Sequence, residues 1–311
     1  MLCPEPESFS TLGLDYAREK CDLTALSLKQ AQFEQQAPAY DAILLRFNTK
    51  RTSSILTPSS RIKAIISPTT GLDHIDMNIA KKRGVKVFHL KGKKRFLKGI
   101  SGTAEHTIGL MLGVMRKIPQ SYEAVKKNIW TPGPFRGNEV AGKTLAVVGC
   151  GRLGSKVSRI GIALGMNVIA YDPFISRFPS KVCTKTTMTD LLRDADVLSL
   201  HVPLEPQTRH LISYDEIKQL KDGVVIVNTA RGSIINSDAL LKGLETGKVS
   251  GAALDVLEDE HSIGKAFNPL IKYACNHDNL LITPHIGGAT YESVENTDRF
   301  ILNMFFSEAK S

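Results

Sequence analysis

Cysteine, tryptophan and long apolar runs are scarce in this chain of 311 residues, which has five cysteines and one tryptophan. The cysteines are odd in number and show no tight spacing, so a reduced protein is expected rather than a disulfide framework. The longest apolar stretch, residues 108–115, is far shorter than the ~18 residues that a membrane helix requires. The N-terminus has neither a basic leader nor an apolar core, which predicts no signal peptide, no membrane partner and a cytoplasmic location.

Clustered metal ligands are lacking as well. Cys275 and His277 form the nearest group, and no further ligand stands at a useful spacing, so no metal site is predicted. No domain follows Ser311 in this sequence, and feedback through an appended regulatory domain is therefore not expected.

Positive charge, in contrast, is abundant, with a formal net charge of +9. Five cations fall within residues 91–98: Lys91, Lys93, Lys94, Arg95 and Lys98. Three interpretations of this basic segment stay open: a solvated loop, a rim that faces an anionic substrate, and a contact with a macromolecule. We expect a small anionic substrate as the partner, and nucleic acid is not expected.

Apolar runs alternate with amphipathic stretches in two series, and the length of the chain favours two domains. The first series predicts strands at 1–3, 23–26, 42–47, 62–66 and 85–88, and helices at 11–20, 28–36, 53–56 and 73–83. The second predicts strands at 145–148, 167–171, 196–200, 224–228, 251–254 and 280–282, and helices at 188–193, 215–221 and 237–246, the last with Ser237 as a good N-cap. This alternation predicts an α/β fold with two doubly wound parallel sheets.

Two further helices are expected, at residues 103–117 and 290–307. The first is so apolar that nearly all of its surface must be covered, by a second domain, by a second subunit, or within the chain.

The stretch TLAVVGCGRLG, residues 144–154, has the pattern of a dinucleotide-binding turn. An apolar run breaks at Gly149, Gly151 and Gly154, spaced as G-x-G-x-x-G, and a helical pattern follows. Such glycines allow a tight turn, the close approach of a pyrophosphate and close helix packing. A second apolar run ends in Asp172, whose carboxylate would bond an adenosine ribose and repel a 2′-phosphate. NAD is therefore the predicted cofactor.

A neighbouring motif is misleading. Residues 137–144, GNEVAGKT, satisfy the P-loop pattern. A P-loop follows a strand and opens a helix, whereas this motif follows a proline-rich segment and precedes a strand, so the nucleotide-triphosphatase interpretation is rejected.

Three side chains suited to catalysis follow apolar runs of the second series. They are Arg231 in NTARGS, Glu260 in ALDVLEDEH and His285 in ITPHIGG. Singly, each has an ordinary structural explanation, as a loop salt bridge, a surface acid or a histidine bonded to a loop carbonyl. Because ligands bind at the carboxyl ends of strands in such sheets, their joint occurrence predicts one catalytic group.

These stretches resemble the D-isomer-specific 2-hydroxyacid dehydrogenases, and most closely their D-3-phosphoglycerate dehydrogenase branch. The matching motifs occur in family order along nearly the whole chain: TTGLDHID (69–76), GTAEHTIGLML (102–112), VVGCGRLG (147–154), HVPLEPQT (201–208), VNTARGSIIN (227–236), GAALDVLEDE (251–260) and TPHIGGAT (283–290). The resemblance implies a Rossmann NAD-binding domain, residues 101–288, inserted into a flavodoxin-like substrate domain, residues 1–100 and 289–311. It also implies a homodimer formed through helix 103–117 and the loop beyond it.

The resemblance further implies site residues. Arg231 would orient a 2-oxo acid, His285 would exchange a proton with it, and Glu260 would hold the histidine. The implied cofactor-binding residues are Thr103, Gly149, Gly151, Arg152, Leu153, Gly154, Asp172, Val202, Pro203, Thr208, Thr229, Ala230, Asp255 and Gly287. The implied substrate-binding residues are Arg46, at a position that binds phosphate in that branch, and Thr69, Thr70 and Gly71. The amides of these last three would form an anion nest, although an ordinary turn explains the same sequence.

The chain also departs from the phosphoglycerate dehydrogenase pattern. His261 stands where proline often follows the catalytic Glu, no arginine lies near Ser67, and the basic segment is an insertion. Another phosphorylated, sulfonated or sugar-derived 2-hydroxy acid therefore stays open as the substrate. The alternative of a different class is an NAD(H)-sensing, non-enzymatic interaction protein similar to the C-terminal-binding-protein corepressors. Formate dehydrogenase is rejected, because glutamine would be expected where Glu260 stands.

Overall fold

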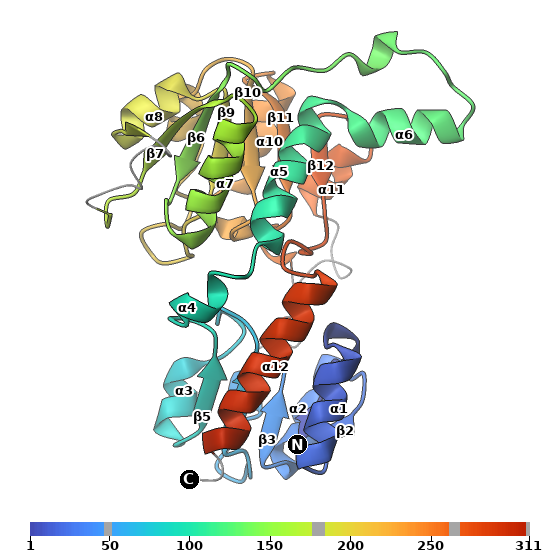
Figure 1. Ribbon diagram of the computed structural model, residues 1–311, viewed down its shortest axis with the longest axis vertical. Helices are drawn as coiled ribbons and strands as arrows, with labels where there is room; N and C mark the ends of the chain where they lie inside the picture. The colour runs from blue at the N-terminus through green and yellow to red at the C-terminus, as the bar shows by residue number, and fades with distance from the viewer. Residues whose placement is uncertain (47–51, 176–183, 261–267, 309–311) are drawn as a thin grey trace. The chain divides into compact units, whose positions relative to one another are not determined.

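The computed structural model describes residues 1–46, 52–175, 184–260 and 268–308. The chain divides into two compact units, residues 1–100 with 289–311, and residues 101–288 (Figure 1).

The first unit is built on five parallel strands in the order β2-β1-β3-β4-β5. Successive strand residues point to opposite faces of the sheet, so Leu2 and Ile43 join one apolar core and Cys3 and Leu44 join the other. The strands are β1 (Leu2–Cys3), β2 (Thr24–Ala25), β3 (Ala42–Leu44), β4 (Ala64–Ser67) and β5 (Lys86–His89). The helices are α1 (Thr11–Lys20), α2 (Gln30–Gln36), α3 (Met77–Lys82), α4 (Lys94–Leu97) and α12 (Tyr291–Glu308), with short 3-10 helices η1 (Pro6–Ser8), η2 (Ala37–Ala39) and η3 (Thr52–Ser54). Helices α1 and α12 cover one face, while α2 and α3 cover the other (Figure 1).

Two helices of this unit differ from the sequence prediction. The helix predicted at 73–83 begins only at Met77, because the Asp76 side chain accepts a hydrogen bond from the Ile79 N–H and caps the helix there. The helix predicted at 53–56 is the single 3-10 turn η3, and position 47 of the predicted third strand lies outside the described residues.

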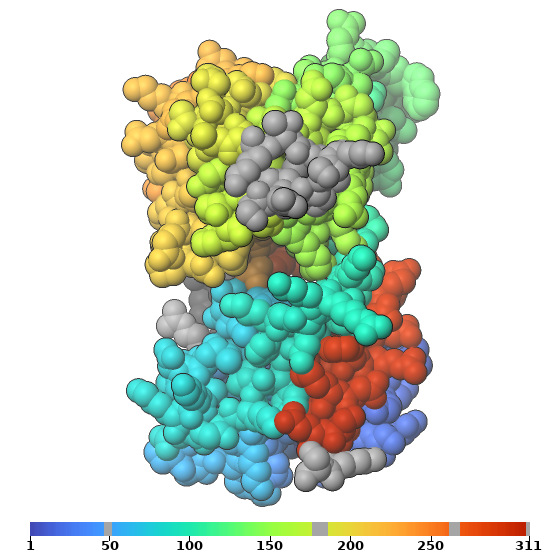
Figure 2. Space-filling view, turned by 60° about the vertical axis from the view of Figure 1, so that its left-hand side comes forward, coloured from blue at the N-terminus to red at the C-terminus, as the bar shows by residue number. Residues whose placement is uncertain are grey.

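The basic segment is not simply a loop, because it contains α4. Leu97 is buried, and the ring of Phe96 stacks on that of Phe300 with centroids 3.9 Å apart. The five cations of the segment are exposed, and none forms an ion pair within the described part of the chain. Figure 2 shows the segment, in teal, on the surface of its unit beside the red α12. Apolar side chains therefore fix the backbone while the charges face outward.

The second unit is built on seven parallel strands in the order β12-β11-β10-β9-β6-β7-β8. The strands are β6 (Thr144–Val148), β7 (Asn167–Tyr171), β8 (Thr184–Lys185), β9 (Val197–Leu200), β10 (Val224–Asn228), β11 (Val249–Leu254) and β12 (Leu280–Ile282). The helices are α5 (Gly102–Met115), α6 (Ile118–Lys126), α7 (Arg152–Ala163), α8 (Met188–Asp194), α9 (Tyr214–Gln219), α10 (Ser237–Glu245) and α11 (Pro269–Ala274), with 3-10 helices η4 (Gly133–Phe135) and η5 (Gly232–Ile234). The strand order reverses between β6 and β9, and ligands of doubly wound sheets bind at the carboxyl ends beside such a reversal.

Helix α5 is covered within its own unit. It packs against α7 and against β10, β11 and β12, and its apolar side chains join the core on that face. Most of its apolar surface is therefore covered within the chain, and a dimer contact through this helix stays a prediction. The exposed apolar side chains lie in the segment that follows: Ile118, Tyr122, Val125, Ile129 and Trp130.

Two local predictions in the second unit can be compared with the structure. The P-loop-like motif ends at Thr144, where β6 begins, so it does not open a helix. The N-cap of α10 is Asn236, whose side chain accepts from the Ala239 N–H, and not Ser237. No helix in the described ranges is both long enough and apolar enough to cross a membrane.

Candidate active site

The turn that carries His285 is held by one buried carboxylate, that of Asp255 at the end of β11. Asp255 Oδ1 accepts hydrogen bonds from the Ile286 N–H at 2.9 Å and from the Thr283 hydroxyl at 2.6 Å, and Oδ2 accepts from the Gly287 N–H at 2.7 Å. Burial by itself raises the pKa of Asp255, but these bonds and the contact with His106 lower it below the ordinary value. The carboxylate therefore stays ionised and fixes residues 283–287.

His285 and Glu260 form a directly bonded pair. His285 Nδ1 lies 2.8 Å from Glu260 Oε1, and both side chains are about one-quarter exposed. The His285 backbone has φ 57°, a left-handed conformation stabilised by its N–H bond to the Asp255 carbonyl. The second Glu260 oxygen accepts from the Leu257 N–H at 3.4 Å. The carboxylate thus orients the imidazole ring through Nδ1.

Arg231 lies directly after β10, at the same edge of the sheet. The buried Asn228 side chain shapes this turn, since it donates to the Arg231 carbonyl and accepts from the Ala230 N–H. The next residue, Gly232, abuts the Glu260 segment so closely that a Cβ there would lie 1.9 Å from the Leu257 carbonyl carbon. The segments of Arg231, Glu260 and His285 therefore meet at one edge of one sheet. The Arg231 guanidinium donates to the Ala230 carbonyl through Nη1 at 2.6 Å.

The turn after β6 fits a dinucleotide. Gly149 has φ +87°, a conformation that favours glycine, and a Cβ on Gly154 would lie 2.0 Å from the Gly149 carbonyl oxygen. Gly151 is the N-cap of α7, no side chain caps that end, and a Cβ there would project into open space. Gly149 and Gly154 are thus needed by the fold, whereas Gly151 leaves room for a pyrophosphate at the helix N-terminus.

Asp172 directly follows β7, beside this turn. Its Oδ2 accepts from the Cys150 N–H and its Oδ1 from the Phe174 N–H, each at 3.0 Å. Each carboxylate oxygen has a second lone pair, so the side chain remains competent to bind a ribose hydroxyl.

The other predicted cofactor residues surround the same carboxyl edge. Thr229 is buried and its hydroxyl lies 2.7 Å from that of Thr107 on α5. The Thr208 hydroxyl bonds the Pro203 carbonyl at 2.6 Å and so folds the loop after β9. Gly287 is buried, and the remaining members are half-buried around these turns: Thr103, Arg152, Leu153, Val202 and Ala230. Burial lowers the pKa of Arg152.

The predicted substrate turn of the first unit is internally braced. The Thr69 hydroxyl donates to the Gly71 carbonyl at 2.7 Å and lies 2.9 Å from the Ser67 hydroxyl. Thr69 is buried and Thr70 is exposed. The Thr69 side chain thus stabilises the turn itself. The groups of this turn that remain for a substrate are the backbone and the exposed Thr70 side chain.

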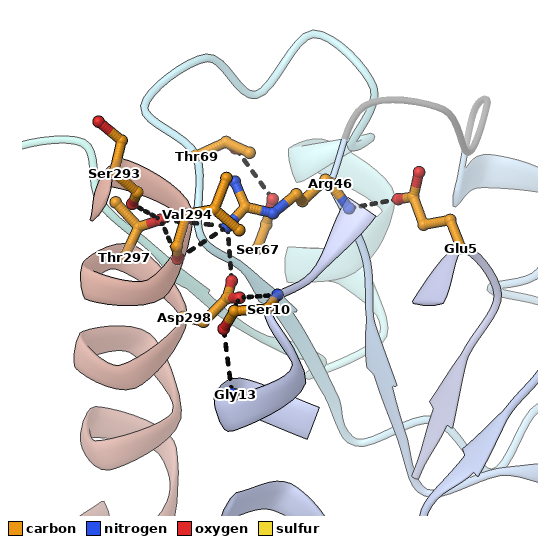
Figure 3. A network of polar contacts seen from close by, with 10 residues as sticks. All are labelled: Glu5, Ser10, Gly13, Arg46, Ser67, Thr69, Ser293, Val294, Thr297 and Asp298. Carbon is orange, nitrogen blue, oxygen red and sulfur yellow. Dashed lines mark hydrogen bonds and ion pairs between the residues drawn. The ribbon is translucent and has the colours of Figure 1, made fainter. Parts of the chain in front are cut away.

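Arg46, the predicted phosphate contact, is paired with a carboxylate in the structure. It is buried, and its Nη2 lies 2.5 Å from Asp298 Oδ1 and 3.1 Å from the Thr297 hydroxyl on α12 (Figure 3). Asp298 in turn accepts from the Ser10 N–H and hydroxyl at the start of α1. In the structure Arg46 ties α12 to the sheet of the first unit, and its contact with a substrate phosphate stays a prediction.

Three residues of the site were not found by sequence reasoning. His106 and Thr283 contact Asp255, and Asn228 shapes the Arg231 turn. The sequence could have indicated Asn228, because it is a polar residue that ends an otherwise apolar strand. No such pattern marks His106, which lies on an apolar helix. Among the described residues no group of three or more His, Cys, Asp and Glu side chains is placed to hold a metal ion.

The fold and the site define a two-unit α/β protein with a dinucleotide-binding sheet and a histidine–carboxylate pair at its carboxyl edge. Residues 108–287 match the family model described as D-isomer specific 2-hydroxyacid dehydrogenase, NAD binding domain. The chain is 37% identical over 308 residues to a D-3-phosphoglycerate dehydrogenase of Archaeoglobus fulgidus, covering 98% of this chain and 56% of that one. It is 34% identical over 291 residues to a hydroxypyruvate reductase of Thermotoga maritima, covering 94% and 92%.

A solved structure agrees with these relatives. The D-lactate dehydrogenase of Aquifex aeolicus, complexed with NAD and lactic acid, superposes with a TM-score of 0.85 at 31% identity, covering 99% of this chain and 95% of that one. The chain therefore belongs to the D-isomer-specific 2-hydroxyacid dehydrogenase family, and NAD is its cofactor. It spans about half the length of the curated D-3-phosphoglycerate dehydrogenases that it matches.

Proposed function

We propose that this protein is an NAD-dependent dehydrogenase that interconverts a D-2-hydroxy acid and its 2-oxo acid. The observation that carries the proposal is the 2.8 Å contact between Glu260 and His285, at the carboxyl edge of the sheet whose first turn holds the dinucleotide glycines. An imidazole backed by a carboxylate is suited to give and take one proton near neutral pH.

The roles of the residues follow from their contacts. When bound, NADH supplies a hydride to the carbonyl carbon of the 2-oxo acid. His285 donates a proton from Nε2 to the carbonyl oxygen, since Nδ1 faces Glu260. Glu260 stabilises the protonated ring and fixes its tautomer. Arg231 binds the substrate carboxylate and the carbonyl oxygen, because it follows β10 at the carboxyl edge of the sheet and a planar guanidinium can bind two acceptor oxygens at once. In the oxidation direction His285 takes the proton back.

The substrate class is proposed from the relatives and the charges of this chain. The Archaeoglobus relative is named for a phosphorylated 2-hydroxy acid, 3-phosphoglycerate, and the Thermotoga relative for a 2-oxo acid without phosphate, hydroxypyruvate. On the first unit, the backbone amides at Thr69, Thr70 and Gly71 are proposed to bind the substrate carboxylate. The exposed basic segment favours an acid with a second anionic group, such as a phosphate.

Self-association is proposed through the segment after α5, in a cytoplasmic homodimer. Tyr122 and Trp130 expose 64% and 86% of their surface, and neighbouring residues of α6 and the following turn are also apolar. Figure 1 shows α6 and the chain beyond it extending away from the sheet of their unit. A second copy of the chain would cover these side chains.

The proposal is tested with purified protein, NADH and a panel of 2-oxo acids that includes phosphorylated members. We expect NADH consumption with at least one acid, loss of turnover in Arg231→Ala, and retained NADH binding in that variant by cofactor fluorescence. Protein that binds NADH and turns over nothing in the panel would contradict the dehydrogenase and favour the NAD(H)-sensing alternative.

A further inference from the structure

The imidazole of His106 reaches the turn of the candidate catalytic histidine from the side of α5. Its Nε2 lies 3.2 Å from Asp255 Oδ1 and 3.0 Å from the Thr283 hydroxyl oxygen. The His106 side chain is 22% exposed and Asp255 only 2%. These contacts join residues that are 149 and 177 positions apart in the sequence.

The proton arrangement in this cluster follows from the bonding capacities of the three groups. Thr283 gives its single hydroxyl proton to Asp255 at 2.6 Å, and an ionised carboxylate can only accept. The contacts from His106 Nε2 to both oxygens are therefore satisfied only if Nε2 carries a proton and shares it between them. In both of its contacts His106 is thus the hydrogen-bond donor. Of the three residues His106, Asp255 and Thr283, only His106 lies on α5.

The same carboxylate supports the turn that presents His285. Asp255 also accepts from the N–H groups of Ile286 and Gly287, and its carbonyl accepts from the N–H of His285. The turn is tightly packed at this point, because a Cβ on Gly287 would lie 2.8 Å from Asp255 Oδ2 and 3.5 Å from the His106 ring. A change in the position of the Asp255 carboxylate must therefore move the backbone of His285.

We propose that His106 is a positioning residue for the reaction: through Asp255 and Thr283 it holds the 283–287 turn so that His285 stays bonded to Glu260 and aimed at the substrate. This inference rests on the proposed dehydrogenase function. Small displacements of a reacting group lower rates strongly, so the side chain acts on the rate without touching the reacting atoms.

The test compares His106→Leu, which removes the donor, with His106→Gln, whose amide nitrogen can take the place of Nε2. Glu105→Gln is the matched control, because Glu105 is an exposed neighbour on the same helix. We expect His106→Leu to lower kcat roughly tenfold or more, with a smaller change in KM for the 2-oxo acid. His106→Gln recovers most of the rate, and Glu105→Gln matches the unsubstituted protein.

A second readout does not depend on turnover. The proton on His285 Nδ1, bonded to Glu260, is expected as a downfield signal in the proton NMR spectrum, identified by its loss in Glu260→Gln. We expect this signal to be lost or exchange-broadened in His106→Leu and retained in His106→Gln.

The outcomes separate the two proposals. If the unsubstituted protein turns over no 2-oxo acid, the proposed function fails, and the NMR comparison still decides whether His106 holds the turn. If His106→Leu keeps both the signal and a rate within twofold of the unsubstituted protein, the positioning role is wrong. The role is also wrong if His106→Gln is as impaired as His106→Leu, because ring bulk and not the donated proton would then matter.

Discussion

His285 Nδ1 lies 2.8 Å from Glu260 Oε1, although the two residues are 25 positions apart in the sequence and follow different strands. The pair forms because β11 and β12 are parallel neighbours, with Leu254 opposite Ile282. The carboxyl ends of these strands therefore place the two following segments side by side, as expected for parallel strands.

Replacing Glu260 by Gln is expected to lower kcat/KM for oxo-acid reduction by roughly 10²–10⁴-fold, the range for loss of acid–base function. The carboxylate orients the ring through Nδ1, so its removal also loosens the position of the imidazole. The measurement is kcat/KM for the 2-oxo acid. Asp259→Asn, which changes an exposed carboxylate one position away, should leave kcat/KM unchanged. Equal values of kcat/KM in the two variants would remove Glu260 from the mechanism.

The glycines of the turn after β6 are expected to respond differently to alanine. A Cβ on Gly154 meets the Gly149 carbonyl oxygen at 2.0 Å, so Gly154→Ala destabilises the fold. A Cβ on Gly151 meets no atom within 4 Å, so Gly151→Ala folds normally but weakens NADH binding, by roughly tenfold or more, because the methyl occupies pyrophosphate space. Thermal unfolding and NADH fluorescence measure the two effects. Unimpaired NADH binding in Gly151→Ala would place the cofactor elsewhere.

The buried pair of Arg46 and Asp298 is expected to stabilise the first unit against separation of α12. Asp298→Asn leaves the guanidinium buried without its counter-charge and should cost about 3–5 kcal/mol in urea unfolding. Replacing both residues by apolar ones, Arg46→Met with Asp298→Leu, should recover part of that loss. Glu308→Gln, which breaks an exposed pair with Lys86, should cost less than about 1 kcal/mol. Equal effects of the buried and exposed changes would contradict this assignment.

Acid pH is expected to destabilise the fold through His201. Burial lowers the pKa of His201 from 6.5 to about 4, and its Nε2 lies 2.8 Å from the Ser199 hydroxyl. The folded state therefore binds fewer protons than the unfolded state between these values, so stability is fully present above pH 6.5 and falls as the pH drops towards 4. The loss should reach about 1–3 kcal/mol. His201→Gln should flatten the dependence of Tm on pH in this window, whereas the exposed His277→Gln should not.

The basic segment is expected to act on substrates that carry a second anionic group. In Lys91→Gln with Lys93→Gln, the KM of a phosphorylated 2-oxo acid should rise about tenfold, since a bond to a charged group is worth about 1.5–3 kcal/mol. The KM of a 2-oxo acid without that group should stay unchanged. Lys81→Gln with Lys82→Gln, on the exposed side of α3, is the control of equal charge. If neither KM responds, the segment is a solvated surface.

Much of the site could be located from the sequence because its signals are local. The G-x-G-x-x-G spacing between an apolar run and a helical pattern, and polar residues directly after apolar runs, depend only on backbone geometry and on burial of neighbouring positions. The α/β class and the family are confirmed on that basis. The spacing also identifies Asp172 and the segments of Arg231, Glu260 and His285 as candidates before any contact is known.

Other features depend on which distant side chains share a buried space, and no local pattern encodes that. Arg46 matched a phosphate-binding position, yet α12 brings Asp298 from 252 positions away to neutralise it. The sequence indicates only that His106 belongs to an apolar helix, whereas the fold brings Asp255 and Thr283 against its ring. Hydrophobic periodicity thus determined the elements and the edge where ligands bind, whereas tertiary packing decided which polar groups pair there, because a buried polar group must find its partner wherever the folded chain provides one.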